Sequence, residues 1–85
     1  MYLLACLPAY NEEGVIGELI KKITPLVDSV VVCDDGSTDL TSKESQDAGA
    51  FVIQHPQNKG KGAALQSLFD FARHSNADVI VTIDG

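Results

Sequence analysis

The sequence predicts an α/β protein whose parallel sheet is covered by helices. Three short apolar runs, at positions 3–7, 29–33 and 78–83, each end at polar residues, as strands buried on both faces do. Between the runs lie segments with helical character, the clearest with apolar residues at three- and four-residue spacing, the period of one helix face. The connections are short, so successive strands are joined through helices by right-handed crossovers.

The first third of the chain predicts one strand and one helix. The strand is expected over 3–7 and is closed by Pro8. The helix is expected to start at Asn11, a good N-cap residue followed by two glutamates, and to stop at Pro25. Apolar residues recur on one face of this segment.

The middle of the chain predicts two strands with a helix between them. The strand at 29–33 is rich in valine and ends at an Asp-Asp-Gly-Ser segment. A helix from Thr38 or Asp39 to Gly49 offers little apolar surface, so we expect it at the rim. Positions 50–53 form a weaker strand candidate.

The last part of the chain predicts a helix and a strand. The helix, from about Lys61 to His74, carries an apolar stripe. The strand at 78–83 is rich in β-branched residues and is followed by Asp84.

Length and charge narrow the function classes. The chain has 85 residues, 45% apolar and 21% charged, which is compatible with one small folded domain and excludes a disordered acidic tail. Six basic against twelve acidic residues argue against a nucleic-acid binder.

The lack of a membrane span or signal peptide in the sequence, together with its cysteine usage, predicts a cytoplasmic chain. The longest apolar stretch, 1–9, is far shorter than the roughly 20 residues of a membrane span and lacks the features of a signal peptide. We therefore expect a soluble, cytoplasmic protein. Cys6 and Cys33 lie inside apolar runs and are expected to be buried free thiols.

Polar residues follow every predicted strand. They are 10–12 after the first, 34–37 after the second, 58–62 after the third and Asp84 after the fourth. Ligands of open parallel sheets bind outside the carboxyl ends of the strands. A binding site is therefore expected at this rim.

The paired aspartates suit a ligand contact better than acid-base chemistry. Asp34 and Asp35 are neighbours on an extended chain, so their side chains point to opposite faces and cannot form the facing pair of a glycosidase. One of them can accept hydrogen bonds from a nucleobase or a ribose hydroxyl. The alternative is a plain Asp-Gly-Ser turn.

The remaining polar groups each have two interpretations. The 60–62 segment lacks the third glycine of a dinucleotide fingerprint, and it does not match a P-loop. Its backbone N–H groups and lysines, at the start of a predicted helix, suit an anion. The alternative interpretation is a flexible connector. Asp84 can bind Mg²⁺ or Mn²⁺ or simply end a strand. Tyr10 can stack on a base or pack on the first helix. His55 and His74 show no partner and receive no role.

Four strings together resemble the successive motifs of family 2 glycosyltransferases, and are closest in pattern to dolichyl- or polyprenyl-phosphate mannose and glucose synthases. They are Pro8-Ala9-Tyr10-Asn11-Glu12, then 32–39, then 58–64, then Asp84. The resemblance implies a GT-A fold, with a Rossmann-like parallel sheet in the strand order 3-2-1-4. It also implies inverting sugar transfer from a UDP- or GDP-linked donor with Mg²⁺ or Mn²⁺. A polyprenyl phosphate is one candidate acceptor, which would associate the full-length protein with a membrane.

The same resemblance assigns roles by position. Those expected to bind the nucleotide-sugar are Pro8, Ala9, Tyr10, Glu12, Cys33 through its backbone, Asp35 through the base, Lys61 near the diphosphate, Asp84 and Gly85. Asp84 matches the first aspartate of the Asp-x-Asp motif and is the expected metal ligand, with Gly85 at the middle position.

The chain stops inside that motif, so the second aspartate, the acceptor-binding segment and the general base are absent from it. We expect residues 1–85 to be the nucleotide-sugar-binding part of a truncated domain, inactive alone, and to self-associate through an exposed sheet edge. No catalytic residue can be named. One alternative is a non-catalytic nucleotide-sugar-binding or interaction module. A receiver-like signalling domain is less favoured, because it would begin with the Asp-Asp strand.

Overall fold

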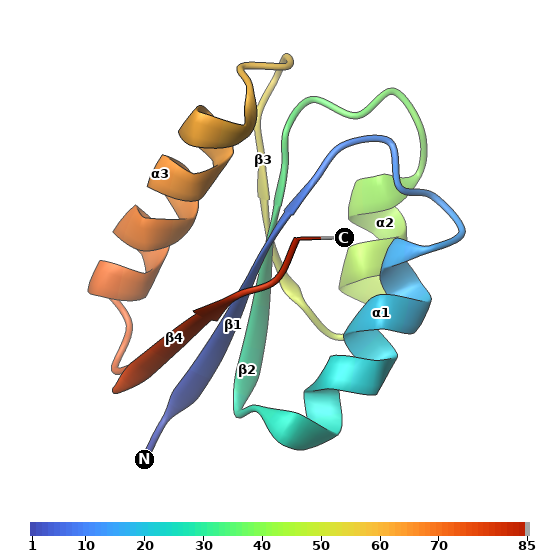
Figure 1. The fold of residues 1–85 in the computed structure, drawn as a ribbon. Helices are drawn as coiled ribbons and strands as arrows, with labels where there is room; N and C mark the ends of the chain where they lie inside the picture. Colours follow the sequence, from blue (N-terminus) through green and yellow to red (C-terminus); the bar gives the residue numbers. More distant parts are fainter. Residues whose placement is uncertain (85) are drawn as a thin grey trace.

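A parallel sheet of four strands organises the fold, in the order β3-β2-β1-β4 (Figure 1). In this computed structural model, which describes residues 1–84, helices cover both faces of the sheet. The strands are β1 (Leu3–Ala9), β2 (Ser29–Asp34), β3 (Phe51–Gln54) and β4 (Val79–Thr82). The helices are α1 (Ile16–Ile23), α2 (Thr41–Asp47) and α3 (Lys61–Arg73), with a short 3-10 turn, η1 (Thr24–Leu26), after α1. The predicted fold class and strand order are confirmed.

The two central strands, β1 and β2, are buried along almost their whole length. They pair from Leu4 opposite Ser29 to Ala9 opposite Asp34. β3 and β4 are shorter, lie at the edges of the described sheet and are partly exposed. The carboxyl ends of β1 and β2 therefore lie level with each other, which places the polar residues after them side by side.

Alternate residues of the central strands face two separate cores, one on each side of the sheet. The core under α1 contains Ala5, Leu7, Ala9, Ile16, Ile20, Ile23, Val30 and Val32. The core under α3 contains Leu4, Cys6, Val31, Cys33, Ala64, Leu68 and Ala72. Burial on both faces explains why these strands read as continuous apolar runs. Cys6 and Cys33 are buried free thiols, as predicted.

Several element boundaries differ from the prediction. β1 continues through Pro8 to Ala9. α1 starts at Ile16, so Asn11 lies outside it, with a φ of 50°. α2 starts at Thr41 instead of Thr38 or Asp39. Polar side chains that precede the two helices bond to a neighbouring loop, as described below, and Asp39 also accepts the Thr41 backbone N–H at 3.0 Å, so it lies just outside the start of α2.

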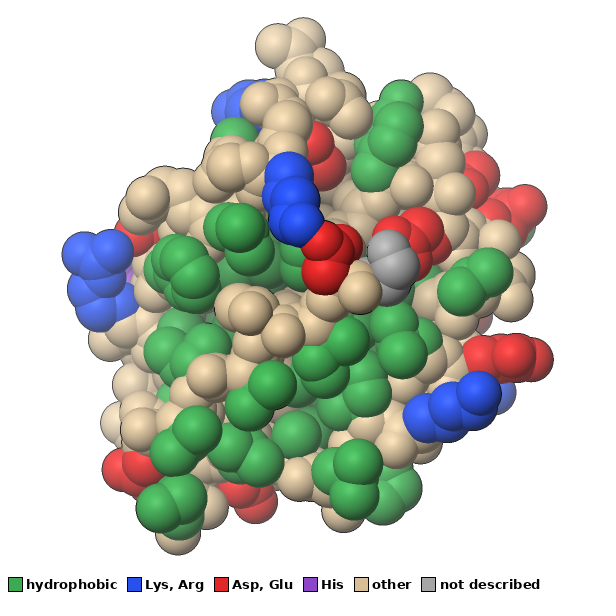
Figure 2. Space-filling model, viewed as in Figure 1, with side chains coloured by type: hydrophobic (Ala, Val, Ile, Leu, Met, Phe, Trp, Pro, Cys, Tyr) green, Lys and Arg blue, Asp and Glu red, His purple; other side chains and the backbone are tan. Residues whose placement is uncertain are grey.

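Apolar side chains are exposed over β4 and the adjoining part of α3 (Figure 2). Phe69, Ile80 and Val81 keep 42%, 43% and 37% of their surface accessible. Self-association through this edge stays a prediction. Among the residues described, no helix has the length and apolar character needed to cross a membrane.

Candidate functional site

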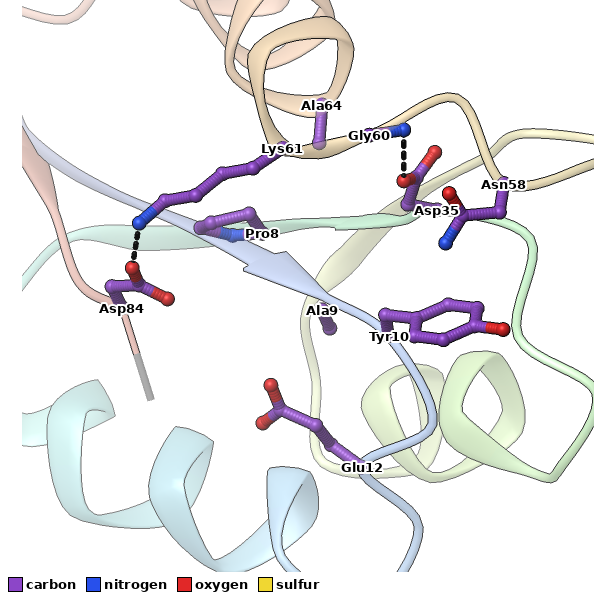
Figure 3. Close-up of a pocket in the computed structure, with 10 residues that line it drawn as sticks. All are labelled: Pro8, Ala9, Tyr10, Glu12, Asp35, Asn58, Gly60, Lys61, Ala64 and Asp84. Atoms are coloured by element: carbon purple, nitrogen blue, oxygen red, sulfur yellow. Dashed lines mark hydrogen bonds and ion pairs between the residues drawn. The ribbon is translucent and has the colours of Figure 1, made fainter.

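A pocket opens at the carboxyl ends of the strands, between the loop after β1, the end of β2, the start of α3 and the segment after β4 (Figure 3). Its volume of about 280 Å³ is near the lower end of the roughly 300–1,000 Å³ of small-molecule sites. The lining residues are Pro8, Ala9, Tyr10, Glu12, Asp35, Asn58, Gly60, Lys61, Ala64 and Asp84. The pocket lies where the strand ends predicted a site.

The structure brings together most of the residues that the resemblance singles out. Those that line the pocket are Pro8, Ala9, Tyr10, Glu12, Asp35, Lys61 and Asp84. Cys33 is fully buried in the core and does not line it. Gly85 lies outside the described residues. Gly60, part of the 60–62 segment expected near an anion, also lines the pocket, and Asn58 and Ala64 are lining residues that had no predicted role of their own. The role of the whole set in holding a ligand stays a prediction.

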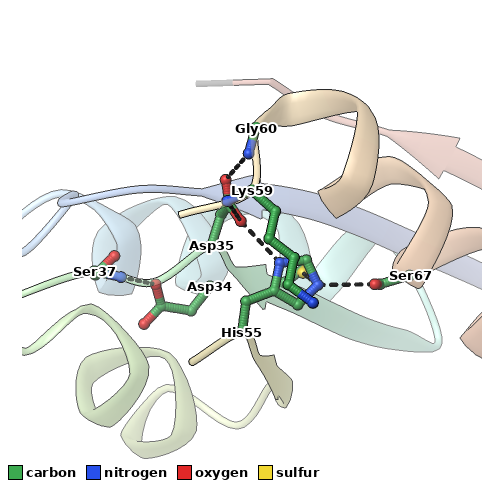
Figure 4. Close-up of polar contacts among 8 residues, drawn as sticks. Asp34, Asp35, Ser37, His55, Lys59, Gly60 and Ser67 are labelled. Carbon is green, nitrogen blue, oxygen red and sulfur yellow. Dashed lines mark hydrogen bonds and ion pairs between the residues drawn. The ribbon is translucent and has the colours of Figure 1, made fainter. Parts of the chain in front are cut away.

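Asp35 is the most heavily bonded side chain of the pocket (Figure 4). Its Oδ1 accepts hydrogen bonds from His55 Nδ1 at 2.8 Å and from the Lys59 backbone N–H at 2.9 Å. Its Oδ2 accepts one from the Gly60 backbone N–H at 2.8 Å. Burial acts to raise the pKa of Asp35, but these hydrogen bonds outweigh it and hold the pKa below its ordinary value. Asp35 is therefore a carboxylate that ties the loop before α3 to the end of β2.

Asp34 points the other way, as predicted. Its Oδ1 accepts a hydrogen bond from the Ser37 backbone N–H at 2.9 Å, and its Oδ2 accepts one from Ser42 Oγ at 2.5 Å. Ser37 lies in the segment that leads into α2, and Ser42 lies in the first turn of α2. This is the turn interpretation of the Asp-Gly-Ser sequence, and it applies to Asp34 while Asp35 faces the pocket.

His55 is the polar residue that sequence reasoning missed, and the interpretation that it stands alone was wrong. It is 8% exposed and bonds to Asp35 through Nδ1 and to Ser67 Oγ through Nε2, the latter at 2.8 Å. The register between β2 and β3 brings His55 next to Asp35. Asp34 pairs with Gln54 at the ends of β2 and β3, so Asp35 and His55 are the first residues after these two strands.

A loop clasp holds the segment after β1 against the segment after β2. Four successive backbone N–H groups, of residues 11–14, donate to side chains of that second segment and of the α2 helix that follows it. The pairs are Asn11 with Ser37 Oγ (2.8 Å), Glu12 with Thr41 Oγ1 (2.9 Å), Glu13 with Asp39 Oδ2 (3.1 Å) and Gly14 with Glu44 Oε1 (2.7 Å). In return, Thr38 and Leu40 donate their backbone N–H groups to Asn11 and Glu13. The clasp positions the stretch that carries Tyr10 and Glu12 into the pocket.

Gly36 allows the turn after β2 to pack closely against the loop before α3, beside the pocket. Its φ of 76° suits glycine, and a Cβ at this position would overlap the backbone of Gln57 and Asn58. The glycine therefore lets the loop before α3 pack against the turn after β2, which brings Asn58 to the pocket wall.

Charges of both signs meet at the mouth of the pocket. Lys61 forms an ion pair with Asp84, and both side chains are more than half exposed. Burial, and then the negative charge of Asp84, raise the pKa of Glu12. Two carboxylates facing one opening favour a cation between them.

The donor set fits part of a hard-metal site. No group of three or more His, Cys, Asp or Glu side chains suited to hold a metal occurs among residues 1–84. Mg²⁺, however, is commonly held by one or two carboxylates together with water and substrate phosphates. Asp84, with Glu12 nearby, supplies oxygen ligands of the right kind, and a bound diphosphate would supply more.

The sequences of two curated relatives match most of this chain. Glucosyl-3-phosphoglycerate synthase from Mycolicibacterium paratuberculosis is 39% identical over 89 residues, a match that covers 92% of this chain and 26% of that protein. Uncharacterized protein MJ1222 from Methanocaldococcus jannaschii is 36% identical over 83 residues, covering 96% of this chain and 34% of that protein. The chain thus spans about a third or less of the length of these relatives.

Solved structures of glucosyl-3-phosphoglycerate synthase from Mycobacterium tuberculosis have the same fold. The complex with Mn²⁺, UDP and glucosyl-3-phosphoglycerate superposes with a TM-score of 0.79 at 35% identity, covering 98% of this chain and 33% of that one. The complex with Mg²⁺ and UDP gives a TM-score of 0.79 at 35% identity, covering 98% and 32%. The finer likeness to polyprenyl-phosphate sugar synthases receives no support from these relatives.

A family model, glycosyl transferase family 2, matches residues 5–85. This match covers the four strands except the first two residues of β1, includes every residue that lines the pocket, and excludes the receiver-domain alternative. The order of strands and helices agrees with it, as do the solved structures. The chain therefore belongs to glycosyl transferase family 2, a family of enzymes that transfer sugars.

Proposed function

We propose that this chain binds the nucleotide-sugar donor of a glycosyltransferase, and that the donor is linked to UDP. The observation that carries the proposal is the pocket itself. It gathers an aromatic ring, carboxylates and a lysine from four strand ends that lie far apart in the sequence. These are the groups that a base, a ribose and a diphosphate need.

Each part of the pocket suits one part of the donor. Tyr10, 47% exposed at the pocket wall, offers a ring face to the base. Asp35 offers an acceptor for a base N–H group. Lys61, at the first turn of α3, offers a positive charge and a helix start to the diphosphate. Pro8 and Ala9 supply the apolar wall between these polar groups.

A divalent cation completes the proposed site. The chain carries a net charge of −6, and both Glu12 and Asp84 line the pocket, so an anionic donor needs compensation there. Asp84 would hold Mg²⁺ or Mn²⁺ against the phosphate oxygens, and the cation would neutralise charge on the leaving diphosphate. The Mn²⁺ and Mg²⁺ in the solved UDP complexes support this choice of metals.

The relatives also favour one donor and one kind of acceptor for the full-length protein. UDP-glucose is bound in one solved complex, which supports UDP over GDP. The names of the relatives support a small phosphorylated acceptor such as phosphoglycerate over a polyprenyl phosphate. We propose hexosyl transfer to such an acceptor as the activity of the whole enzyme.

Calorimetric titration of the 85-residue chain tests the donor proposal. UDP is titrated in three separate experiments, one with Mn²⁺, one with Mg²⁺ and one with a chelator, and GDP is titrated for comparison. We expect UDP binding that weakens by about tenfold or more without metal. Asp70→Asn, on the exposed face of α3, is a control that should leave binding unchanged. Absence of heat with UDP and metal at millimolar nucleotide would contradict the proposal.

A further inference from the structure

His55 is a buried polar group with a hydrogen-bond partner at each ring nitrogen. Nδ1 lies 2.8 Å from Asp35 Oδ1, and Nε2 lies 2.8 Å from Ser67 Oγ and 3.6 Å from Cys33 Sγ. His55 does not line the pocket, whereas Asp35 does. Among the hydrogen-bond partners of His55, Asp35 is the one that lines the pocket, and it is the direct route from His55 to a ligand.

The partners determine how the ring is oriented. The Asp35 carboxylate accepts hydrogen bonds, so Nδ1 must carry a proton and donate it. Burial, with the charges of Asp35 and Asp34, raises the pKa of Cys33 to about 11, so the thiol keeps its proton. Nε2 then has one lone pair, to which the Ser67 hydroxyl at 2.8 Å or the more distant Cys33 thiol can donate. A ring turned over by 180° would place Cδ2 toward Asp35 and Cε1 toward Ser67 and would lose both hydrogen bonds, so the network holds one orientation.

The same network uses up most of the acceptor capacity of Asp35. A carboxylate offers about four acceptor positions, two on each oxygen. Oδ1 accepts from His55 and Lys59, and Oδ2 accepts from Gly60. Among the described contacts, one acceptor position therefore remains, and it belongs to Oδ2.

We propose that His55 is a positioning residue for the donor base: it locks the Asp35 carboxylate so that a single acceptor, on Oδ2, is offered to the pocket. This inference rests on the proposed function and deepens it. A uracil presents one N–H between two carbonyl oxygens, whereas a guanine presents two adjacent donor groups. One locked acceptor satisfies the first and leaves a donor of the second without a partner, which disfavours guanine.

Three substitutions at His55 separate positioning from simple packing. His55→Asn places its amide nitrogen where Nδ1 lies and can still donate to Asp35. His55→Gln places its amide nitrogen nearer Nε2 and cannot reproduce that contact from the same side-chain path. His55→Phe fills the buried space of the ring without any donor. His74→Asn, at the exposed end of α3, is the matched control on the other histidine.

The first readout is the affinity of the full 85-residue chain for UDP and GDP, by calorimetry with Mn²⁺. We expect the dissociation constant for UDP to rise by about tenfold or more in His55→Phe and His55→Gln, as loss of a charge-assisted hydrogen bond implies. His55→Asn should stay within about threefold of the unmodified chain, and the preference for UDP over GDP should fall in parallel with the affinity for UDP. His74→Asn should change neither.

The second readout needs no nucleotide. Amide hydrogen exchange of Lys59 and Gly60 reports whether the Asp35 carboxylate still holds their N–H groups. We expect faster exchange at both in His55→Phe and His55→Gln, and near-native protection in His55→Asn. The Asn and Gln variants, both polar amides, keep the comparison available if the Phe variant fails to fold.

The outcomes distinguish this inference from the donor proposal. If the unmodified chain binds no UDP, the donor proposal fails and the base preference with it, while amide exchange still decides the positioning of Asp35. Equal binding of UDP and GDP by the unmodified chain overturns the single-acceptor argument. If His55→Phe matches the unmodified chain, or binds UDP better than His55→Asn, His55 acts by packing and the inference is overturned.

Discussion

Asp34 and Asp35 are identical neighbours at the end of one strand, yet they serve two different regions of the molecule. They are 1% and 4% exposed, so burial does not separate them. Asp34 turns toward α2 and bonds to the segment after β2. Asp35 turns toward α3, bonds to the loop before it and lines the pocket.

The difference shows that two neighbouring residues at one strand end can have separate roles, one in stabilising a loop and one in lining the pocket. Consecutive side chains of a strand face opposite sides of the sheet, so one aspartate closes each flanking loop. The Asp34 region, which comprises Asp34 and its partners Ser37 and Ser42, adjoins the loop clasp, and the clasp supports the pocket wall without lining it. The Asp35 region is part of the wall itself. Changes on the two sides should therefore separate stability from ligand affinity.

Asp35→Ala should have the largest effect of any substitution at this strand end. It leaves His55 and two backbone N–H groups without their acceptor, and we expect the free energy of unfolding to fall by about 3 kcal/mol. UDP binding should be lost as well. Urea denaturation measures the first effect and calorimetry the second. Retained UDP affinity in a folded Asp35→Ala chain would show that Asp35 does not contact the donor.

Asp34→Ala should cost stability while leaving the pocket chemistry in place. The Ser37 backbone N–H and the Ser42 hydroxyl lose their acceptor, and we expect a loss of about 1–3 kcal/mol in unfolding free energy. The UDP dissociation constant of the folded fraction should change by no more than about threefold. An affinity loss as large as that of Asp35→Ala would erase the distinction between the two regions.

Acid should weaken the Asp35 region in a defined pH window. The folded pKa of Asp35 lies below its ordinary value of 3.8, so its contribution to stability is fully present above that value. The contribution is lost as the pH falls through the lower folded pKa. Other carboxylates, among them Asp39, also titrate in this range.

The difference between the unmodified chain and Asp35→Asn isolates the Asp35 contribution. Unfolding free energies are measured for both from pH 6 downward, a range that begins about two units above the ordinary pKa of an aspartate. The gap between the two curves should be constant at the upper end and narrow below about pH 4. A gap independent of pH would contradict the lowered pKa.

Lys61 and Lys43 offer the mildest comparison of the two regions. Each forms an exposed ion pair with an aspartate, Lys61 with Asp84 at the pocket and Lys43 with Asp47 on α2. Exposed pairs contribute little to folding, so Lys61→Gln and Lys43→Gln should both leave the melting temperature nearly unchanged. Only Lys61→Gln should weaken UDP binding, by a few-fold and less at high salt. A loss with Lys43→Gln would indicate a non-specific charge effect.

Much of the fold was predictable from local patterns. Continuous apolar runs identified the strands, because β1 and β2 are buried on both faces. The apolar stripe of α3 placed that helix correctly to within one residue at its end. The starts of α1 and α2 were not predictable, because Asn11 and Thr38 bond to each other across the two loops, and Asp39 bonds to the Glu13 N–H across the loop as well as to the Thr41 N–H of α2.

The sequence by itself determined the fold class, the rim where polar residues follow the strands, and most of the residues around the pocket. Order along the chain is enough for these, since parallel strands bring their carboxyl ends to one edge. The family resemblance already assigned Asp35 to the donor base, and tertiary structure decided which residues hold its carboxylate. His55 lies twenty residues from Asp35 in the chain and meets it only through the pairing of β2 with β3. Such contacts depend on register and burial, which no local pattern around a single histidine encodes.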